Sequence, residues 1–384
     1  MEKTINKSTT MKILFTFTVP LEQNSGGVQR VTSILMQEFN KMGVFTSYLQ
    51  CNDTYTRFIY NQKEYLTLSS IIKDFDIIIN QDGYSDTFTK KLIKENWKGK
   101  YIVCLHNTPN MYEKYYSFKS MIQGLRYSTW SRKWYLIRTI LYPIWKPVMI
   151  KGFIKKQKFN YLYANATILL SNKFINLFVN NTRIKSPEKL YAINNPLTYD
   201  YDPIYHKENK KNEILIVSRL SSEKRIELAI KAWELVTNKE NWILTIVGDG
   251  SSKDSLIKFV KSNNIPNVYF KGLQNPLDYY KRSKIFLMTS AFEGWGMTLT
   301  EAQQNGCVPI AMNSYLSITD IISDSHNGII IENNNIKKFA KAIEELINNQ
   351  DKLDRMAINA IKSTQKFQSQ HIAQTWIKLI SNIR

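Results

Sequence analysis

The feature that most constrains this fold is a regular alternation of short apolar runs and helix-like stretches in the second half of the chain. Apolar runs of strand length occur at 214–217, 242–247, 268–270, 285–289 and 308–311. Helix-like stretches occupy 223–237, 253–263, 298–305, 336–348, 352–364 and 369–381. Parallel strands joined by helices produce this spacing. We therefore predict an α/β protein with a doubly wound parallel sheet in this half.

The first half shows the same alternation less regularly. Buried-strand patterns lie at 12–18, 75–80, 101–105 and 166–171, and a helical pattern follows Gly26-Gly27. Because 384 residues are too many for one ordinary core, we predict two Rossmann-like domains. The N-terminal domain is placed at 1–195, with an insertion at about 111–165, and the C-terminal domain at 196–365. A last helix, 366–384, can cross back to the N-terminal domain.

The net charge of +20 is concentrated in one segment. Fourteen of the 52 Lys and Arg residues lie between Lys114 and Lys185, and no acidic residue lies between Glu113 and Glu188. Aromatic residues are interleaved with the basic ones over 112–165. This combination favours an anionic membrane surface as partner. The alternatives are an insertion whose aromatic residues form an ordinary core and, ranked lower because no nucleic-acid module accompanies the charge, nucleic-acid binding. No nucleic acid is therefore expected as a partner.

Other features bear on location. The three cysteines (Cys51, Cys104, Cys307) are far apart and lack metal-ligand spacing, so we expect reduced thiols in the cytoplasm. The run 13–21 is typical of a first strand and not of a secretion signal. Charged residues and prolines interrupt the apolar stretch 134–154, so one bilayer-spanning helix is not expected there. We expect a protein that is peripheral at the inner face of the cytoplasmic membrane.

Turns that follow strands are the candidate binding sites, because ligands of open parallel sheets bind beyond the carboxyl ends of the strands. The run 214–217 is followed by a turn with Arg219 and Lys224, two cations beside an expected helix N-terminus. This arrangement suits a diphosphate, although a solvated basic turn is the alternative. The run 242–247 is followed by Gly248-Asp249-Gly250, where glycine permits close approach of the backbone.

The turn after 285–289 carries the most specific pattern. Glu293 lies in the loop and Glu301 about one turn into the next helix, so both carboxylates can face one ligand. The amides of Gly296, Met297 and Thr298 lie at the positive helix end. Carboxylates that accept sugar or ribose hydroxyls, beside amides that bind phosphate, are typical of a nucleotide-sugar pocket. A simpler alternative for Glu301 is a favourable first-turn acid.

These motifs resemble the family 4 glycosyltransferases (GT4), whose GT-B fold has two Rossmann-like domains with parallel sheets facing across a cleft. Residues 293–301 resemble the E-x7-E signature of the family, preceded in the family's order by the SRLSSEK and VGDG turns. Upstream, Gly26-Gly27-Val28 resembles the glycine loop, Leu105-His106-Asn107 the N-domain histidine position, and Asn194-Asn195-Pro196 the entry to the C-domain. The resemblance is strong over about 214–348, partial over 11–110 and close to absent over 111–165.

The resemblance implies a retaining, metal-independent transfer of a hexose or N-acetylhexosamine. The donor would be a UDP- or GDP-sugar, and the acceptor a lipid-linked or cell-surface polysaccharide such as bacterial lipopolysaccharide or capsule. It also implies roles for individual residues. Arg219 and Lys224 would neutralise the leaving diphosphate, Glu301 would accept from the ribose, and Glu293 with the amides of Gly296, Met297 and Thr298 would hold the donor sugar. Gly26, Gly27 and Gly248 would allow close approach of the backbone to substrate, and His106 would lie beside the reacting sugar or be purely structural.

Two D-x-D sequences could indicate a metal–nucleotide site. Asp74 and Asp76 precede an expected strand, and Asp200 and Asp202 lie in the linker between the domains. Because neither pair follows a strand beside the donor turns, we expect no metal and no other cofactor. Two alternative functions remain at this point. One is a membrane-associated GT-B protein without turnover, and the other is a phosphorylase or synthase of the same fold.

Overall fold

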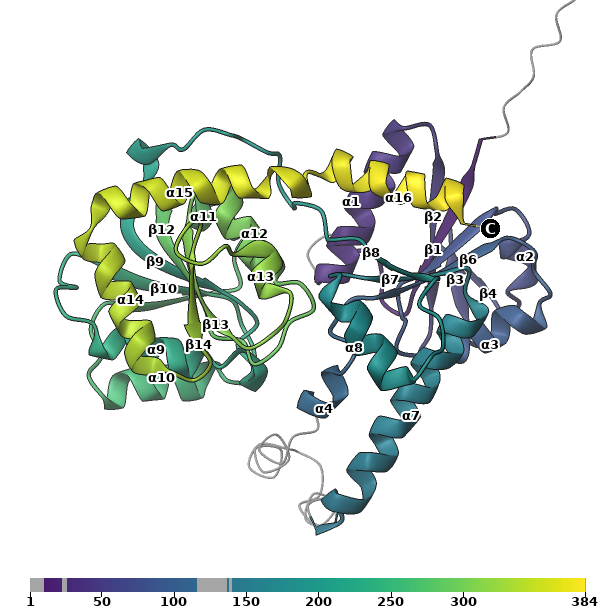
Figure 1. Cartoon of the computed structure of the whole chain (residues 1–384), viewed down its shortest axis with the longest axis horizontal. Helices are drawn as coiled ribbons and strands as arrows, with labels where there is room; N and C mark the ends of the chain where they lie inside the picture. Colours follow the sequence, from purple (N-terminus) through teal and green to yellow (C-terminus); the bar gives the residue numbers. More distant parts are fainter. Residues whose placement is uncertain (1–9, 23–25, 116–136, 138–139, 384) are drawn as a thin grey trace, which may run out of the picture. The chain divides into compact units, whose positions relative to one another are not determined.

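The computed structural model describes residues 10–22, 26–115, 137 and 140–383 (Figure 1). The chain divides into two compact units. The first comprises residues 1–109, 147–196 and 369–384, and the second comprises 110–146 and 197–368. The last helix, α16 (Ser369–Asn382), thus belongs to the first unit, where it packs against α1 (Gly27–Lys41). Both units contain a sheet flanked by helices, and each is described by itself.

The first unit contains an eight-stranded sheet in the order β4-β3-β2-β1-β5-β6-β7-β8. The pairs among β1, β2, β5, β6, β7 and β8 are parallel, whereas β3 and β4 extend one edge as an antiparallel hairpin. The strands are β1 (Lys12–Phe17), β2 (Phe45–Cys51), β3 (Phe58–Tyr60), β4 (Lys63–Tyr65), β5 (Ile77–Asn80), β6 (Lys100–Leu105), β7 (Ala166–Leu169) and β8 (Leu190–Ala192). Besides α1 and α16, the helices of this unit are α2 (Ser69–Ile72), α3 (Thr87–Lys94), α8 (Lys173–Thr182) and most of α7 (Tyr142–Tyr163). Helix α4 (Met111–Tyr115) and the first residues of α7 fall in the range 110–146 of the second unit.

The second unit contains a six-stranded parallel sheet in the order β11-β10-β9-β12-β13-β14. The strands are β9 (Lys211–Val217), β10 (Ile243–Val247), β11 (Val268–Gly272), β12 (Ser283–Met288), β13 (Val308–Asn313) and β14 (Ile329–Glu332). The helices are α9 (Ile226–Leu235), α10 (Lys253–Ser262), α11 (Leu277–Arg282), α12 (Met297–Gln304), α13 (Ile318–Ile321), α14 (Ile336–Asn348) and α15 (Gln350–Thr364). The predicted α/β class with two parallel sheets is therefore confirmed.

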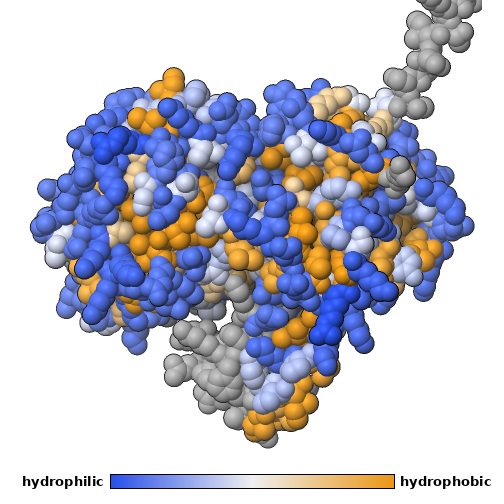
Figure 2. Space-filling view, in the orientation of Figure 1, coloured by the Kyte–Doolittle hydropathy of each residue, from blue (hydrophilic) through white to orange (hydrophobic). Residues whose placement is uncertain are grey.

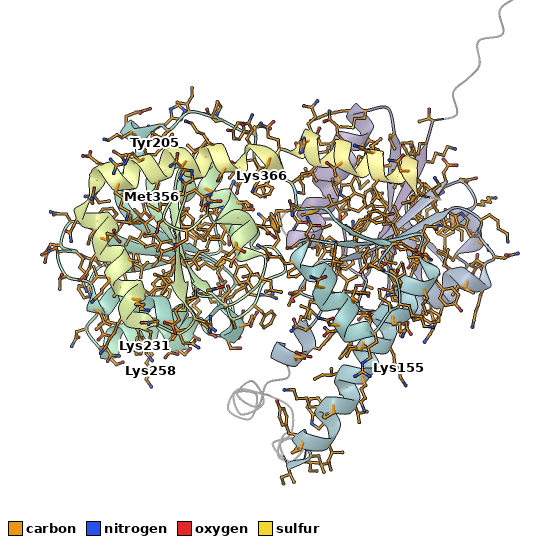
Figure 3. All side chains as sticks on the ribbon, viewed as in Figure 1. Lys155, Tyr205, Lys231, Lys258, Met356 and Lys366 are labelled. Atoms are coloured by element: carbon orange, nitrogen blue, oxygen red, sulfur yellow. The ribbon has the colours of Figure 1, made fainter. Side chains whose placement is uncertain are left out.

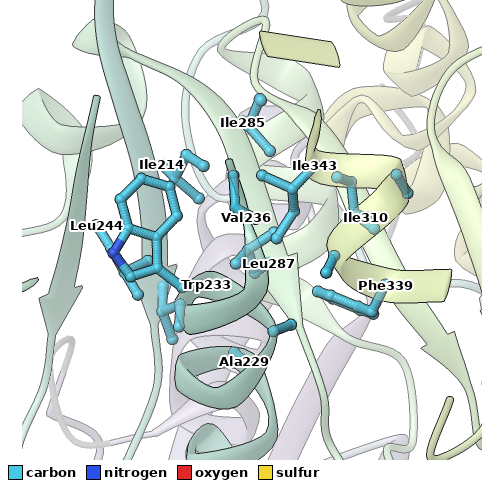
Figure 4. Packing of buried hydrophobic residues seen from close by; sticks show 14 of the residues in the cluster. Ile214, Ala229, Trp233, Val236, Leu244, Ile285, Leu287, Ile310, Phe339 and Ile343 are labelled. Carbon is cyan, nitrogen blue, oxygen red and sulfur yellow. The ribbon is translucent and has the colours of Figure 1, made fainter. Parts of the chain in front are cut away.

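The core of the second unit explains why the alternation of its strands and helices could be predicted from the sequence. Central strands contribute fully buried aliphatic side chains such as Ile214, Leu244 and Ile285. Trp233 of α9 and Phe339 of α14 pack on them and are also fully buried (Figure 4). Strands covered by helices in this way need apolar residues on both faces, which produces continuous apolar runs in the sequence.

Two stretches differ from the expectation or lie outside it. The helix expected at 223–237 is divided into a 3₁₀ turn (Ser222–Lys224) and α9, because Arg225 adopts a left-handed conformation with φ of 50°. Part of the predicted insertion, 116–136, lies outside the described residues, and the remainder contains α4 and α7. Within the described part of the chain, no helix has the length and apolar content needed to cross a bilayer.

Candidate functional site

The turn that carries Arg219 forms backbone hydrogen bonds with the glycine turn after β10. The amide of Leu220 donates to the Asp249 carbonyl over 2.8 Å, and the amide of Ser252 donates to the Leu220 carbonyl over 2.8 Å. Gly248 has a φ of 136°, and a Cβ there would stand 1.9 Å from the Ser218 carbonyl oxygen. Only glycine fits this contact. The close approach at Gly248 is therefore backbone-to-backbone packing between the two turns, and an approach of Gly248 to substrate stays a prediction.

Lys224 and Glu293, separated by 69 positions in the sequence, form an ion pair. The Lys224 ammonium lies 2.6 Å from Glu293 Oε1, and both side chains are largely buried. Arg219 differs, since its side chain is 74% exposed and its guanidinium lies 3.9 Å from Glu223. The structure thus brings two of the predicted residues together and leaves the Arg219 charge open to solvent on the supporting turn.

The N-terminus of α12 follows Glu293 directly. Gly296 has a φ of 93°, which reverses the chain so that the helix begins at Met297. The Gly294 carbonyl accepts a hydrogen bond from Ser317 Oγ over 2.9 Å, and the Tyr315 hydroxyl closes the space beside Gly296. The first amides of a helix have no partner within it, so Met297 and Thr298 present donors at a positive dipole end. This end can bind an anion or a sugar oxygen.

Arg225 anchors the loop after β12, a role that the sequence analysis did not assign. Its guanidinium donates to the carbonyls of Thr289 and Ser290 over 2.6 and 2.8 Å and to the side chains of Asn333 and Asn334. The Thr289 hydroxyl in turn donates to the carbonyls of Lys224 and Arg225. These bonds fasten the segment with Lys224 to the strand end that precedes Glu293. A third basic residue directly after Lys224 was the only sequence signal for this role.

Glu301 lies inside the second unit and is completely buried. Its carboxylate accepts hydrogen bonds from Thr198 Oγ1 over 2.7 Å and from the Tyr280 hydroxyl over 2.9 Å. The spacing of the two glutamates predicts that Glu301 faces a ligand together with Glu293. In the structure Glu301 joins the linker, α11 and α12, while Glu293 pairs with Lys224. Its role toward a ribose remains a prediction.

The first unit has its own candidate groups at the carboxyl edge of its sheet. Gly27 is the first residue of α1, directly after β1 and its loop, and Gly26 is the preceding cap residue. A Cβ at Gly26 would meet Gln29 Oε1 at 2.7 Å. His106 directly follows β6. Because the strands are parallel, these groups lie at one edge of the sheet.

His106 is paired with Gln81, a residue that the sequence analysis missed. His106 Nε2 lies 2.5 Å from Gln81 Oε1, which can only accept, so Nε2 carries the proton and Nδ1 is an acceptor. His106 Nδ1 and Gln81 Nε2 are both buried without a hydrogen-bond partner. Burial lowers the pKa of His106 to about 4, so the ring is neutral at pH 7. Each of these two atoms could form a hydrogen bond with a substrate hydroxyl, His106 Nδ1 as acceptor and Gln81 Nε2 as donor.

Neither D-x-D sequence forms a metal-binding cluster. Asp76 accepts a hydrogen bond from the Lys12 amide over 2.8 Å at the start of β5. Asp202 accepts from the Ile204 amide and lies 2.9 Å from His206 Nε2. Among the described residues, no group of three or more His, Cys, Asp or Glu side chains is arranged to hold a metal ion.

Two Rossmann-like units with parallel sheets define the class as GT-B, and solved structures agree. The pneumococcal O-GlcNAc transferase GtfA in complex with UDP and GlcNAc has a TM-score of 0.72 and 12% identity, over 98% of this chain and 99% of that one. Anabaena Alr3699/HepE in complex with UDP and glucose has a TM-score of 0.70 and 15% identity, over 97% of this chain and 99% of that chain. At these identities the likeness shows the fold.

A family match lies within the second unit. Residues 200–363, which contain Arg219, Lys224, Glu293 and Glu301, match the family described as "Glycosyl transferases group 1". The fold is therefore GT-B, and its second unit carries a segment similar to group 1 glycosyltransferases, in agreement with the GT4 resemblance.

Relatives come from bacterial polysaccharide biosynthesis. The "Poly(ribitol-phosphate) alpha-N-acetylglucosaminyltransferase" of Staphylococcus aureus is 32% identical over 43% of this chain and 34% of its own length. A Campylobacter jejuni "alpha-1,4-N-acetyl-D-galactosaminyltransferase", whose name includes a PP-undecaprenol saccharide, is 27% identical over 46% of this chain and 49% of its own length. Each match thus spans half or less of the relative.

Proposed function

We propose that this protein is a retaining glycosyltransferase that moves a hexose or N-acetylhexosamine from a UDP- or GDP-sugar to a saccharide acceptor. The observation that carries the proposal is the Lys224–Glu293 pair, which joins the turn that also carries Arg219 to the loop that leads into α12, within the segment that matches group 1 glycosyltransferases. Cations, a carboxylate and helix amides are the groups that a diphosphate and a sugar ring require. UDP is the first nucleotide to test, because the GtfA and HepE structures contain it.

Charge stabilisation at the leaving diphosphate accounts for catalysis in this proposal. Negative charge grows on the diphosphate as the bond to the sugar breaks, and Arg219 and Lys224 stabilise that charge more than the ground state. Diphosphate binding draws Lys224 toward the phosphate and releases Glu293 to a sugar hydroxyl. With two cations and a helix N-terminus in place, transfer needs no metal. The α linkages in the names of both curated relatives favour a retaining outcome for an α-linked donor.

The acceptor proposed is a lipid-linked or cell-surface polysaccharide. The Campylobacter relative's name includes a PP-undecaprenol saccharide, and the Staphylococcus relative's name includes poly(ribitol-phosphate). In the first unit, His106 Nδ1 is an acceptor and Gln81 Nε2 a donor without a partner, and sugar hydroxyls would supply partners to both. The basic segment between Glu113 and Glu188 favours action at an anionic membrane surface on the cytoplasmic side.

The test is a nucleotide screen followed by a transfer assay on the full chain. UDP should raise the unfolding temperature more than GDP, and Arg219→Ala should weaken that shift, because a ligand that binds only the folded state stabilises it. UDP-hexose and UDP-N-acetylhexosamine should then label a lipid-linked saccharide fraction. Binding without transfer would support the inactive GT-B alternative. Turnover that depends on free phosphate would support a phosphorylase, and absence of any nucleotide shift would contradict the proposal.

A further inference from the structure

The polarity of helix α7 changes along its axis. From Tyr142 to Ile150 the sequence contains one charged residue, Lys146, whereas Lys151, Lys155, Lys156 and Lys158 follow within the next eight positions. An amphipathic helix that lies flat on a surface separates its polar and apolar residues around the axis. Helix α7 instead has an apolar end and a basic middle.

The apolar end is exposed. Ile144 and Val148 are 69% and 64% exposed, and Ile140, two residues before the helix, is 73% exposed. Figure 2 shows this apolar surface at the N-terminal end of α7. Lys151 and Lys155 continue the same helix face. Val148 follows Ile144 by four positions, Lys151 follows Val148 by three, and Lys155 follows Lys151 by four. Lys155 points outward from α7 in Figure 3.

An anionic bilayer is the occupant that fits this surface. Exposed aliphatic groups need an apolar environment, and the lysines that follow them along the helix axis need anionic groups next to that environment. A second copy of the chain would bring the same lysines close together and be repelled. Nucleic acid would leave the aliphatic end without a partner, because bases stack on aromatic side chains.

We propose that α7 enters an anionic membrane end-first, with Ile144 and Val148 among the acyl chains and Lys151 and Lys155 at the lipid headgroups. Nine residues of helix are about 13 Å long, slightly less than half of a hydrocarbon core of about 30 Å. Pro147 has no N–H for the Pro143 carbonyl, which favours shallow insertion with water or headgroups nearby. This inference rests on the membrane surface in the proposed function and names the element that contacts it.

The other end of α7 is fixed to the first unit by two buried amides. Gln157 Nε2 donates to the Pro109 carbonyl over 2.9 Å. Asn160 Nδ2 donates to the carbonyls of Gly83 and Ser85 over 3.0 and 2.8 Å, and Asn160 Oδ1 accepts from Thr89 over 2.6 Å. The loops held in this way follow β5 and β6, the strands that precede Gln81 and His106. Helix α7 is thus joined directly to the loops beside Gln81 and His106.

Depth measurement tests the orientation of the helix. The three native cysteines are 3% exposed or less, so a cysteine introduced by Val148→Cys or Lys155→Cys can be labelled selectively with a fluorophore. The vesicles contain equal amounts of phosphatidylcholine and phosphatidylglycerol, with bromine on the acyl chains. We expect strong quenching of the label at 148 and weak quenching at 155. The two positions share one helix face, so equal quenching would mean that α7 lies flat and would overturn the end-first proposal.

A matched pair of double variants tests the contact itself. Ile144→Ser with Val148→Ser should lower the partition coefficient onto these vesicles about 100-fold, because two buried aliphatic contacts are lost. Leu162→Ser with Leu273→Ser removes two exposed leucines, one at the opposite end of α7 and one after β11, and should leave the partition coefficient unchanged. Equal loss in both pairs, or a dimer-to-monomer change with unaltered vesicle binding, would overturn the proposal. The UDP-induced thermal shift is measured on the same proteins, so failure of the donor proposal is seen separately.

Discussion

The buried, neutral His106 predicts a specific loss of stability in mild acid. Its pKa is lowered by burial to about 4 in the folded protein, against an ordinary value of 6.5. Between these values the unfolded chain binds a proton that the folded protein does not, so the free energy of unfolding falls as the pH falls. From pH 7 to pH 5 the loss works out to about 2 kcal/mol, and it levels off at about 3 kcal/mol near pH 3.

The assay is urea unfolding of wild type and His106→Gln at pH 7 and pH 5. Glutamine keeps a polar group beside Gln81 but does not titrate, so the wild type should lose about 2 kcal/mol more than the variant between the two pH values. His206→Gln gives a control of opposite sign, since hydrogen bonds to Asp202 and Glu208 raise the pKa of His206. That interaction stabilises the fold below pH 6.5 and is lost as the pH rises through the raised pKa. If the His106→Gln and wild-type curves shift in parallel, the imidazole is not buried as described.

Four further predictions concern the second unit. Arg219→Ala or Lys224→Ala should lower kcat by about 10- to 150-fold, because each loses a charge-assisted contact of about 1.5–3 kcal/mol; near-normal transfer by the double variant would remove the diphosphate assignment. Glu301→Ala should weaken UDP binding and also destabilise the fold, since it strands the hydroxyls of Thr198 and Tyr280, whereas retained urea stability would contradict the buried geometry. Transfer should survive EDTA, and a loss that Mn²⁺ restores would show metal dependence. Gly248→Ala should cost about 3 kcal/mol in urea unfolding, and Gly272→Ala, where a Cβ meets nothing within 4 Å, about 1 kcal/mol; equal costs would mean that the two turns can separate.

The alternation of strands and helices was predictable because it rests on local periodicity. Strands β9, β10, β12 and β13 are covered by helices and read as continuous apolar runs, and α14 was predicted to the residue. The edge hairpin of β3 and β4 was missed because its strands are three residues long and partly exposed. The break before α9 depends on the left-handed conformation of Arg225, which local sequence does not specify for a non-glycine residue.

The turns that carry the candidate site could be predicted from the sequence, but the contacts between their side chains could not. Lys224 and Glu293 are 69 positions apart, and Glu301 meets Thr198 across 103 positions. Periodicity carries no information about such distances, so the sequence could name these residues without showing which of them would meet. Gln81 was missed for the same reason, since its importance arises only from contact with His106.

The attachment of α7 at Asn160 has a consequence for the choice of acceptor. Val148 and Asn160 are about 18 Å apart along the helix axis, at 1.5 Å per residue. With Val148 in lipid, α7 acts as a spacer that holds the loops after β5 and β6 at a set height above the bilayer. A sugar attached directly to the lipid would lie below that height, whereas the end of a longer saccharide would reach it. Under the proposed function, acceptors would then be selected by the length already built, independently of which sugars they carry.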